Sequence, residues 1–301
     1  MQSRNNSNNV DVMLGNPKKA LISMSIPLII SLLISSLYNL IDAAWVSGLG
    51  ADALAGVGFF TPIFMILVGF GNGLGAGAAF AISKYIGEEN KPKADNASIH
   101  SILIDIVVSI IITVILLFSL VSILNAMGVG QTIGYATDYG NIIVLGSIFI
   151  ILSNALYGIY RGEGDSKRPM YAMMASAILN MILDPIFIYT LNLGVKGAAI
   201  ATIISAIFVI LILVYWFYIK KDTYLKPILS NFNFKRSIGF DIVKVGIPAS
   251  IQLLNNAFFA AVFSALLAFL SSSSSGSTKA PGRMATNKRP IDLIGIFSPT
   301  A

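Results

Sequence analysis

Long apolar stretches separated by short polar loops dominate this chain. Seven stretches of about 20 or more residues can be marked, at 20–45, 54–83, 98–124, 139–160, 170–192, 196–219 and 242–270. A helix of about 20 residues crosses about 30 Å of hydrocarbon. The pattern therefore predicts an all-α polytopic membrane protein with seven membrane helices in this sequence.

Polar residues interrupt the fifth stretch near its middle. Asn180 and Asp184 are four residues apart, so on a helix they share one face and could hold one small ion or proton. Pro185 has no N–H, which leaves the carbonyl of Met181 without its helical partner and predicts a local bend. An ionisable group at membrane depth costs about 2.5 to 3.5 kcal/mol, which favours a functional role. The alternative is a neutral Asp184 that only joins helices by hydrogen bonds.

The first stretch contains a second acid. Tyr38 and Asp42 are again four residues apart, after a proline at Pro27. The first and fifth helices run in the same direction, and both acids lie past the midpoint of their helices. We therefore expect Asp42 and Asp184 to meet in one cavity in the outer half of the membrane.

Composition supports a membrane protein and excludes several kinds of chemistry. The 301 residues are 55% hydrophobic and 11% charged, with mean hydropathy +0.79, whereas soluble domains carry about 25% charged residues. The net charge of +6 comes from basic residues in short loops, and we expect no nucleic-acid partner. The absence of cysteine from the sequence excludes disulfides and thiolate catalysis.

The distribution of Lys and Arg predicts the orientation. Fifteen lie in the segment 1–19 or in and next to the loops after the second, fourth and sixth stretches. Only Lys196, at the start of the sixth stretch, lies next to one of the other loops between the seven stretches. Because cytoplasmic loops carry the excess of basic residues, we expect a cytoplasmic N-terminus. The segment 1–19 lacks the charged-then-apolar order of a signal peptide, so we expect it to be retained. The basic linker 220–241 is then cytoplasmic as well.

Several other polar positions allow more than one interpretation. The glycine run Gly69–Gly77 is better explained by close helix packing than by phosphate binding, because no Lys-Ser/Thr of a P-loop follows. We expect His100 and Asp105 to be interfacial or paired with a loop. Asn154 lies within the fourth stretch, and Thr202 within the sixth could serve a site or bond to its own helix.

A short internal repeat marks the start of a second half. Ile-Pro at Pro27 recurs as Ile-Pro at Pro248, 221 residues later and after the basic linker. A repeat of six helices predicts twelve in all, with 242–270 as the first helix of the second set. Residues 271–301 are atypical, because they place basic residues on the expected outer side, so we expect a truncated or altered C-terminus.

With these residues in view, the chain resembles the multidrug and toxic compound extrusion (MATE) family, DinF-like branch, over about residues 14–270. The resemblance rests on five segments: Ile26-Pro-Leu-Ile29, Leu40–Gly50, Ala53-Leu-Ala-Gly-Val-Gly58, Arg161–Pro169 and Leu179-Asn-Met-Ile-Leu-Asp-Pro185. It implies two pseudo-symmetric six-helix lobes, of which 20–219 is the N-terminal lobe. It also implies a central cleft that alternates between the two sides of the membrane.

The resemblance implies a coupling-ion site in the N-terminal lobe. The matching residues here are Tyr38, Asp42, Asn154, Asn180, Asp184 and Thr202. The coupling ion is H⁺ or Na⁺, and the sequence leaves this open. Na⁺ would bind at Asp42, Asn180 and Asp184, and no other cofactor is expected. Pro27 and Pro185 are the candidate helix-bending residues.

The predicted function is a secondary antiporter and not an enzyme. It would export organic, often cationic and amphipathic compounds across the cytoplasmic membrane, as a monomer in the lipid bilayer. Common apolar residues, such as Met173, Met174 and Met181, would build a promiscuous cleft.

Three alternatives are weaker. A lipid-linked oligosaccharide flippase of the same superfamily would be expected to line its cleft with several cationic residues, and no Lys or Arg lies inside the predicted spans beyond their first three residues. A two-aspartate intramembrane protease would need Tyr-Asp and Gly-x-Gly-Asp, but Ile41 and Leu183 precede the two acids. Two matched acids at membrane depth argue against a purely structural subunit.

Overall fold

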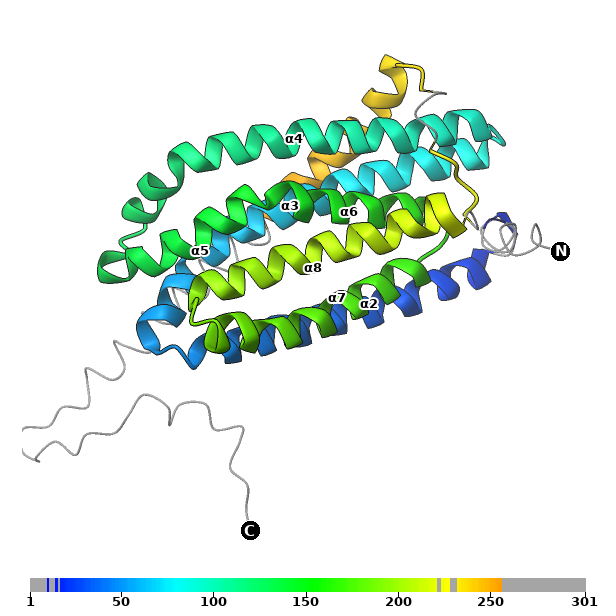
Figure 1. The fold of residues 1–301 in the computed structure, drawn as a ribbon. Helices are drawn as coiled ribbons and strands as arrows, with labels where there is room; N and C mark the ends of the chain where they lie inside the picture. The colour runs from blue at the N-terminus through cyan, green and yellow to red at the C-terminus, as the bar shows by residue number, and fades with distance from the viewer. Residues whose placement is uncertain (1–9, 11–13, 16, 221–222, 228–231, 256–301) are drawn as a thin grey trace, which may run out of the picture. The chain divides into compact units, whose positions relative to one another are not determined.

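Helices make up the architecture of the part of the chain that the computed structural model describes, namely residues 10, 14–15, 17–220, 223–227 and 232–255. The main helices are α2 (Pro17–Ser47), α3 (Ala51–Gly87), α4 (Lys91–Ala126), α5 (Ile133–Leu145), α6 (Ser147–Gly162), α7 (Lys167–Pro185), α8 (Val195–Tyr215) and a further helix, Arg236–Asn255. A 3₁₀ turn, Gly130–Thr132, precedes α5, and π-helical turns follow α7 at Ile186–Thr190 and α8 at Trp216–Lys220. Figure 1 shows the main helices running roughly along one common direction.

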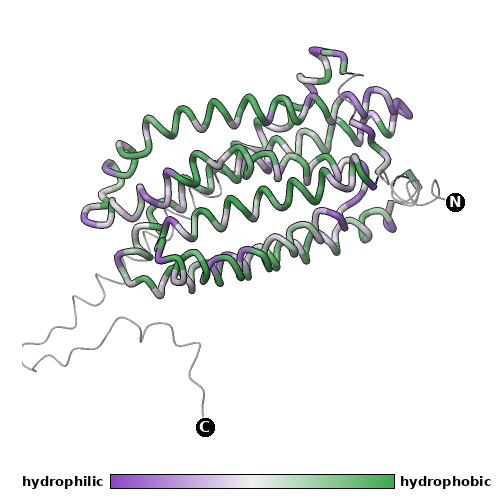
Figure 2. Tube along the Cα trace, in the orientation of Figure 1, coloured by the Kyte–Doolittle hydropathy of each residue, from purple (hydrophilic) through white to green (hydrophobic). Residues whose placement is uncertain are grey.

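These helices confirm the prediction of an all-α polytopic membrane protein. In the described residues, six helices are long and apolar enough to cross a membrane, and there are up to seven spans if the α5 and α6 pair counts as one. In Figure 2 most of each helix has the green colour of hydrophobic residues, whereas the purple of hydrophilic residues is concentrated towards the helix ends. Residues 256–270 of the predicted seventh span and the whole tail 271–301 lie outside the described residues.

The fourth span differs from the single helix predicted at 139–160. Helix α5 begins six residues earlier, at Ile133, and meets α6 at an angle of 53°. Gly146 lies at the break, where an added Cβ would collide with the side chain of Ile203 on α8. The bend therefore brings the backbone of this span close to α8.

The glycine run of α3 packs helices together, as predicted. A Cβ on Gly75 would lie 2.7 Å from the carbonyl oxygen of Asn154 on α6, and a Cβ on Gly158 would collide with the backbone of Gly75. On a neighbouring face, Gly77 contacts the helix Arg236–Asn255 at Gly246. Only residues without side chains permit backbones to approach this closely.

The proline near the end of α7 coincides with a change of helix type. The α-helical part ends at Pro185, and the chain continues as the π-helical turn Ile186–Thr190. The missing N–H of proline removes one α-helical hydrogen bond, which explains why the change occurs there. In α2, the Ser31 hydroxyl donates to the carbonyl oxygen of Pro27 at 2.8 Å, four residues back.

Side-chain acceptors of the bundle hold the backbone of the linker that follows α8. Asp95 accepts a hydrogen bond from the N–H of Lys226 at 2.8 Å, and Glu163 accepts one from Leu225 at 3.0 Å. His100 donates from Nδ1 to the carbonyl oxygen of Asn96, and its Nε2 accepts the N–H of Lys235 at 3.1 Å. His100 therefore pairs with a loop, as predicted.

Asp105, unlike His100, does not pair with a loop residue among the described residues. It lies on the same helix, α4, but its side chain is buried and neither carboxyl oxygen has a hydrogen-bond partner among the described residues. The residues Ser101 and Ser109, one turn to either side, donate their hydroxyls to the helix backbone at Ala97 and Ile106. The loop pairing predicted for Asp105 is therefore absent among the described residues.

Candidate functional site

Two carboxyl groups from different helices lie together inside the bundle. Asp42 lies near the end of α2 and Asp184 near the end of α7, and the two side chains interact electrostatically. Asp184 has no exposed surface, whereas Asp42 is half-buried. Both oxygens of Asp184 and one of Asp42 lack a hydrogen-bond partner among the described residues. The structure thus brings together the two acids that the sequence singled out.

Three further predicted residues surround this pair. The Tyr38 hydroxyl lies 3.4 Å from Oγ1 of Thr202, and Thr202 donates its own proton to the carbonyl oxygen of Ala198 at 3.1 Å. Tyr38 is therefore the donor in the contact between them. Asn180 is buried one turn before Asp184 and interacts with its carboxyl, while the Asn180 amide nitrogen has no hydrogen-bond partner among the described residues.

Tyr139 is a member of this cluster that sequence reasoning missed. It lies on α5, is 6% exposed, and interacts with Asp42, Tyr38 and Asp184. In the sequence it stands at the first position of an apolar stretch, where an aromatic residue is usually interfacial. Because α5 begins earlier than predicted and meets α6 at a bend, this position belongs to the interior instead.

A cavity of about 840 Å³ opens beside the acids, lined by residues of α2, α3, α5, α6, α7 and α8. Its polar lining residues include Ser35, Tyr38, Asn39, Asp42, Asn72, Tyr139, Asn154, Tyr157, Arg161, Ser166 and Thr202. Asp42 is in the wall, but Asp184 is not among the lining residues. An ion can therefore approach the pair from the cavity through Asp42.

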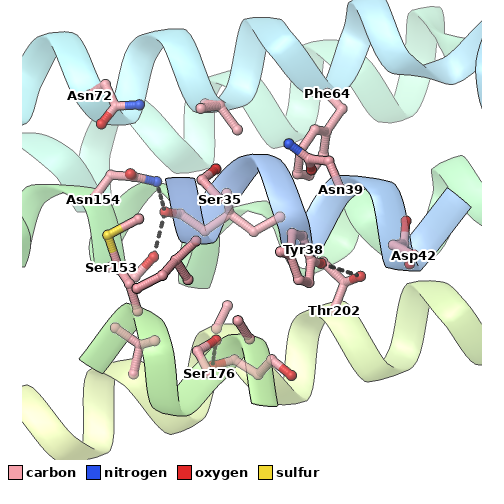
Figure 3. Close-up of a pocket in the computed structure, with 18 of the residues that line it drawn as sticks. Ser35, Tyr38, Asn39, Asp42, Phe64, Asn72, Ser153, Asn154, Ser176 and Thr202 are labelled. Carbon is pink, nitrogen blue, oxygen red and sulfur yellow. Dashed lines mark hydrogen bonds between the residues drawn. The ribbon is translucent and has the colours of Figure 1, made fainter. Parts of the chain in front are cut away.

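Asn154 lines the same cavity at another level. Figure 3 shows it beside Ser153 and facing Asn72, away from Tyr38 and Asp42. Its amide nitrogen donates to the carbonyl oxygen of Ile150 at 2.8 Å. The structure therefore gathers five of the six predicted coupling residues and places the sixth elsewhere on the cavity wall.

The lining also includes a cation that the sequence analysis placed outside the spans. Arg161 belongs to the last turn of α6, which extends to Gly162, and its Nε donates to the carbonyl oxygen of Tyr157 at 3.1 Å. The expectation that no Lys or Arg lies inside the spans is thus wrong, because the helix continues into the polar Arg-Gly-Glu-Gly-Asp sequence. Of the three methionines expected in the cleft, only Met173 is among the lining residues.

The geometry of the acid pair limits its chemistry. Two neighbouring carboxyl groups in a low-dielectric interior repel each other when both are charged, so binding of one cation or proton between them relieves a large electrostatic cost. Buried oxygens without partners are the groups that such an ion would satisfy. Among the described residues there is no group of three or more His, Cys, Asp or Glu that could hold a metal ion.

This chain is similar to one protein family and to several multidrug export proteins. Residues 27–186 match the MatE family model. The multidrug export protein MepA of Staphylococcus haemolyticus is 33% identical over 245 residues, which cover 78% of this chain and 52% of that protein. The chain spans about half the length of the curated relatives it matches.

Two solved transporter structures are similar to this chain in both sequence and fold. A MOP superfamily transporter from Pyrococcus furiosus is 42% identical, with a TM-score of 0.79 over 82% of this chain and 55% of that one. An outward-facing multidrug resistance MATE family transporter gives the same identity, TM-score and shares.

Proposed function

This chain belongs to the MatE family, and on that premise we propose that it acts as a cation-coupled antiporter that exports organic compounds. The observation that supports the proposal best is the pair Asp42 and Asp184, which bridges two helices next to a large cavity. The acids would bind the coupling ion, and the cavity would bind the exported compound. We propose transport and not catalysis as the activity.

In this mechanism the empty acid pair is charged and its members repel each other. Binding of H⁺ or Na⁺ removes the repulsion and lets α2 and α7 approach at Asp42 and Asp184. Because α2 also supplies part of the cavity wall, movement of α2 about Pro27 changes the shape of the binding space. Coupling requires the ion to bind one cavity shape more tightly than the other.

The two candidate ions would use different groups. A proton needs only the carboxyl groups of Asp42 and Asp184. Na⁺ needs several oxygen ligands, and we propose that Asn180, whose side chain interacts with the Asp184 carboxyl, would join the two acids in binding it. We therefore propose one shared ion site and leave its occupant to the experiment below.

The cavity suits organic substrates in size and lining. Ligand pockets commonly measure about 300 to 1,000 Å³ and combine apolar walls with a few polar groups. The volume here is about 840 Å³, with Phe60, Phe64 and Met173 among the apolar lining residues. A flippase for a pyrophosphate-linked oligosaccharide would need several cations, whereas Arg161 is the sole cation among the lining residues that the structure describes. The antiporter is therefore the better-supported proposal.

We further propose that the protein resides in the cytoplasmic membrane with its N-terminus in the cytoplasm and works as a monomer. The distribution of basic residues supports the orientation. Lys84 lies in the last turn of α3, Lys91 and Lys93 at the start of α4 and Lys167 at the start of α7, whereas Lys196 lies at the start of the following helix, α8.

The proposal is tested with ethidium uptake into everted membrane vesicles that contain this protein, because their cytoplasmic face points outward. The proton gradient and the sodium gradient are collapsed separately with selective ionophores. We expect loss of transport with one of the two, which identifies the ion. Transport that is indifferent to both gradients would reject the coupling role of Asp42 and Asp184.

A further inference from the structure

Three hydrogen-bond donors lie together at the end of the cavity that is remote from the acids. Tyr157 and Arg161 lie in the last two turns of α6, and Ser166 precedes α7. All three line the cavity. Asp184 lies near the other end of α7, about 25 Å away at 1.5 Å rise per residue. The cavity therefore has an acidic end and a separate basic end.

The guanidinium group of Arg161 has unused donors. Its Nε donates to Tyr157, and no described residue forms a hydrogen bond or ion pair with its two terminal nitrogens. Arg168, seven residues later, is different, because its NH1 lies 3.0 Å from Asp165 and 3.9 Å from Glu163. Asp165 thus pairs with Arg168, and no carboxylate of the described residues pairs with Arg161.

Ser166 provides a second, independent sign of a missing ligand. Its side chain is 3% exposed, and its hydroxyl has no hydrogen-bond partner among the described residues. Ser166 stands at the N-cap position of α7 but does not cap the helix, because Asp165 accepts the N–H groups of Lys167 and Arg168 instead. A buried hydroxyl without a partner carries a desolvation cost that a bound acceptor would remove.

We infer that this end of the cavity binds the oxyanion of an amphipathic organic molecule, held by Arg161, Ser166 and Tyr157. A carboxylate, sulfonate or phosphate presents two or more acceptor oxygens, which match the paired terminal nitrogens of a guanidinium group. The Tyr157 hydroxyl, to which no described residue bonds, adds a third donor. Apolar neighbours such as Met173 and Val209 would receive the body of the molecule.

This inference rests on the proposed function in taking the cavity as the substrate site. It extends the substrate class from cationic compounds to anionic and zwitterionic ones. A zwitterion of suitable length would place its anionic group at Arg161 and its cationic group towards Asp42.

The test compares two probes with the same apolar body and opposite charge, pyrenesulfonate and pyrenemethylammonium. Binding to the full chain in phosphatidylcholine nanodiscs is measured by fluorescence anisotropy, without any ion gradient. We expect Arg161→Gln to weaken pyrenesulfonate binding by about tenfold or more, because a charge-assisted contact is lost. Ser166→Ala should weaken it about threefold, and Arg161→Lys should retain part of the affinity. Pyrenemethylammonium binding should stay unchanged in all three variants.

Lys196→Gln is the charge-matched control, because it removes one positive charge from a side chain that is 50% exposed and far from this end. It should alter neither probe. Equal sulfonate binding by the wild-type protein and Arg161→Gln would overturn the inference, and so would an equal loss for both probes. Because no gradient is applied, this result is independent of whether the ion-coupling proposal survives.

A further arm identifies the source of the anion. The nanodiscs are prepared again with phosphatidylglycerol. Displacement of pyrenesulfonate from both the wild-type protein and the control Lys196→Gln would assign the site to a lipid phosphate. Undiminished binding would assign it to a free organic anion.

Discussion

The Tyr38 hydroxyl on α2 donates to Thr202 on α8 at a distance of 3.4 Å, directly beside Asp42 and Asp184. This contact joins α2, which carries Asp42, to α8, which packs against α7, the helix that carries Asp184. Loss of the hydroxyl in Tyr38→Phe should therefore weaken ion coupling without abolishing it. Since one neutral hydrogen bond contributes about 1 kcal/mol, we expect the ion concentration for half-maximal ethidium efflux to rise about fivefold.

Tyr171→Phe is the control for that variant, because Tyr171 lies on α7, is 49% exposed and is not among the cavity-lining residues. It should transport like the wild-type protein. An unchanged half-maximal concentration in Tyr38→Phe would show that the contact has no part in coupling.

Removal of either charge of the acid pair should have a larger effect. We expect Asp42→Asn and Asp184→Asn to abolish gradient-driven efflux, because an amide can neither release a proton nor supply a full charge to Na⁺. Membrane insertion should remain intact. Asp138→Asn serves as the control, since Asp138 is exposed and pairs with Lys196 at 3.3 Å. Wild-type transport by both variants of the pair would refute the proposed role.

The buried Glu163 should make stability depend on pH. Burial raises the pKa of this carboxyl from 4.5 to about 8, although the N–H of Leu225 opposes the shift. The folded protein therefore holds a proton that the unfolded chain has released, so stability falls as pH rises from about 4.5 to 8. Relative to Glu163→Gln, the melting temperature of the wild-type protein should decline over this interval. Parallel curves for the two proteins between pH 5 and 8 would contradict this.

The contact between α3 and α6 should not tolerate a methyl group. In Gly75→Ala the new Cβ would stand 2.7 Å from the carbonyl oxygen of Asn154, so the helices must separate. We expect a loss of about 1 to 3 kcal/mol, seen as a lower melting temperature. Gly134→Ala, in α5, meets nothing within 4 Å and should be neutral or slightly stabilising.

The helical fold and the two acids could be predicted from the sequence, because the hydrocarbon interior of a membrane requires long apolar helices with few ionisable residues. An apolar run long enough to span the membrane reads as a helix, and an acid within it is conspicuous. The pattern therefore singles out Asp42 and Asp184, and the common direction of their helices predicts that they lie at one depth. Pro185 likewise indicated where α7 departs from regular α-helix.

The remaining site residues depend on packing, which the sequence pattern does not express. Tyr139 reaches the acids only because α5 and α6 meet at a bend. Asn154 is polar and at membrane depth, but the rotation of α6 directs it to another part of the cavity. Arg161 was assigned to a loop, since Gly162 and Gly164 suggested a turn before the helix in fact ends.

The linker after α8 has a consequence for how this protein can change during evolution. Its peptide N–H groups at Leu225, Lys226 and Lys235 bind Glu163, Asp95 and His100, and every residue except proline supplies such a group. Substitutions at these three positions, other than to proline, would thus keep the three contacts. The three acceptor side chains are less replaceable. A substitution of Glu163, Asp95 or His100 would remove the hydrogen bond to the linker backbone, whereas most substitutions in the linker itself would keep it.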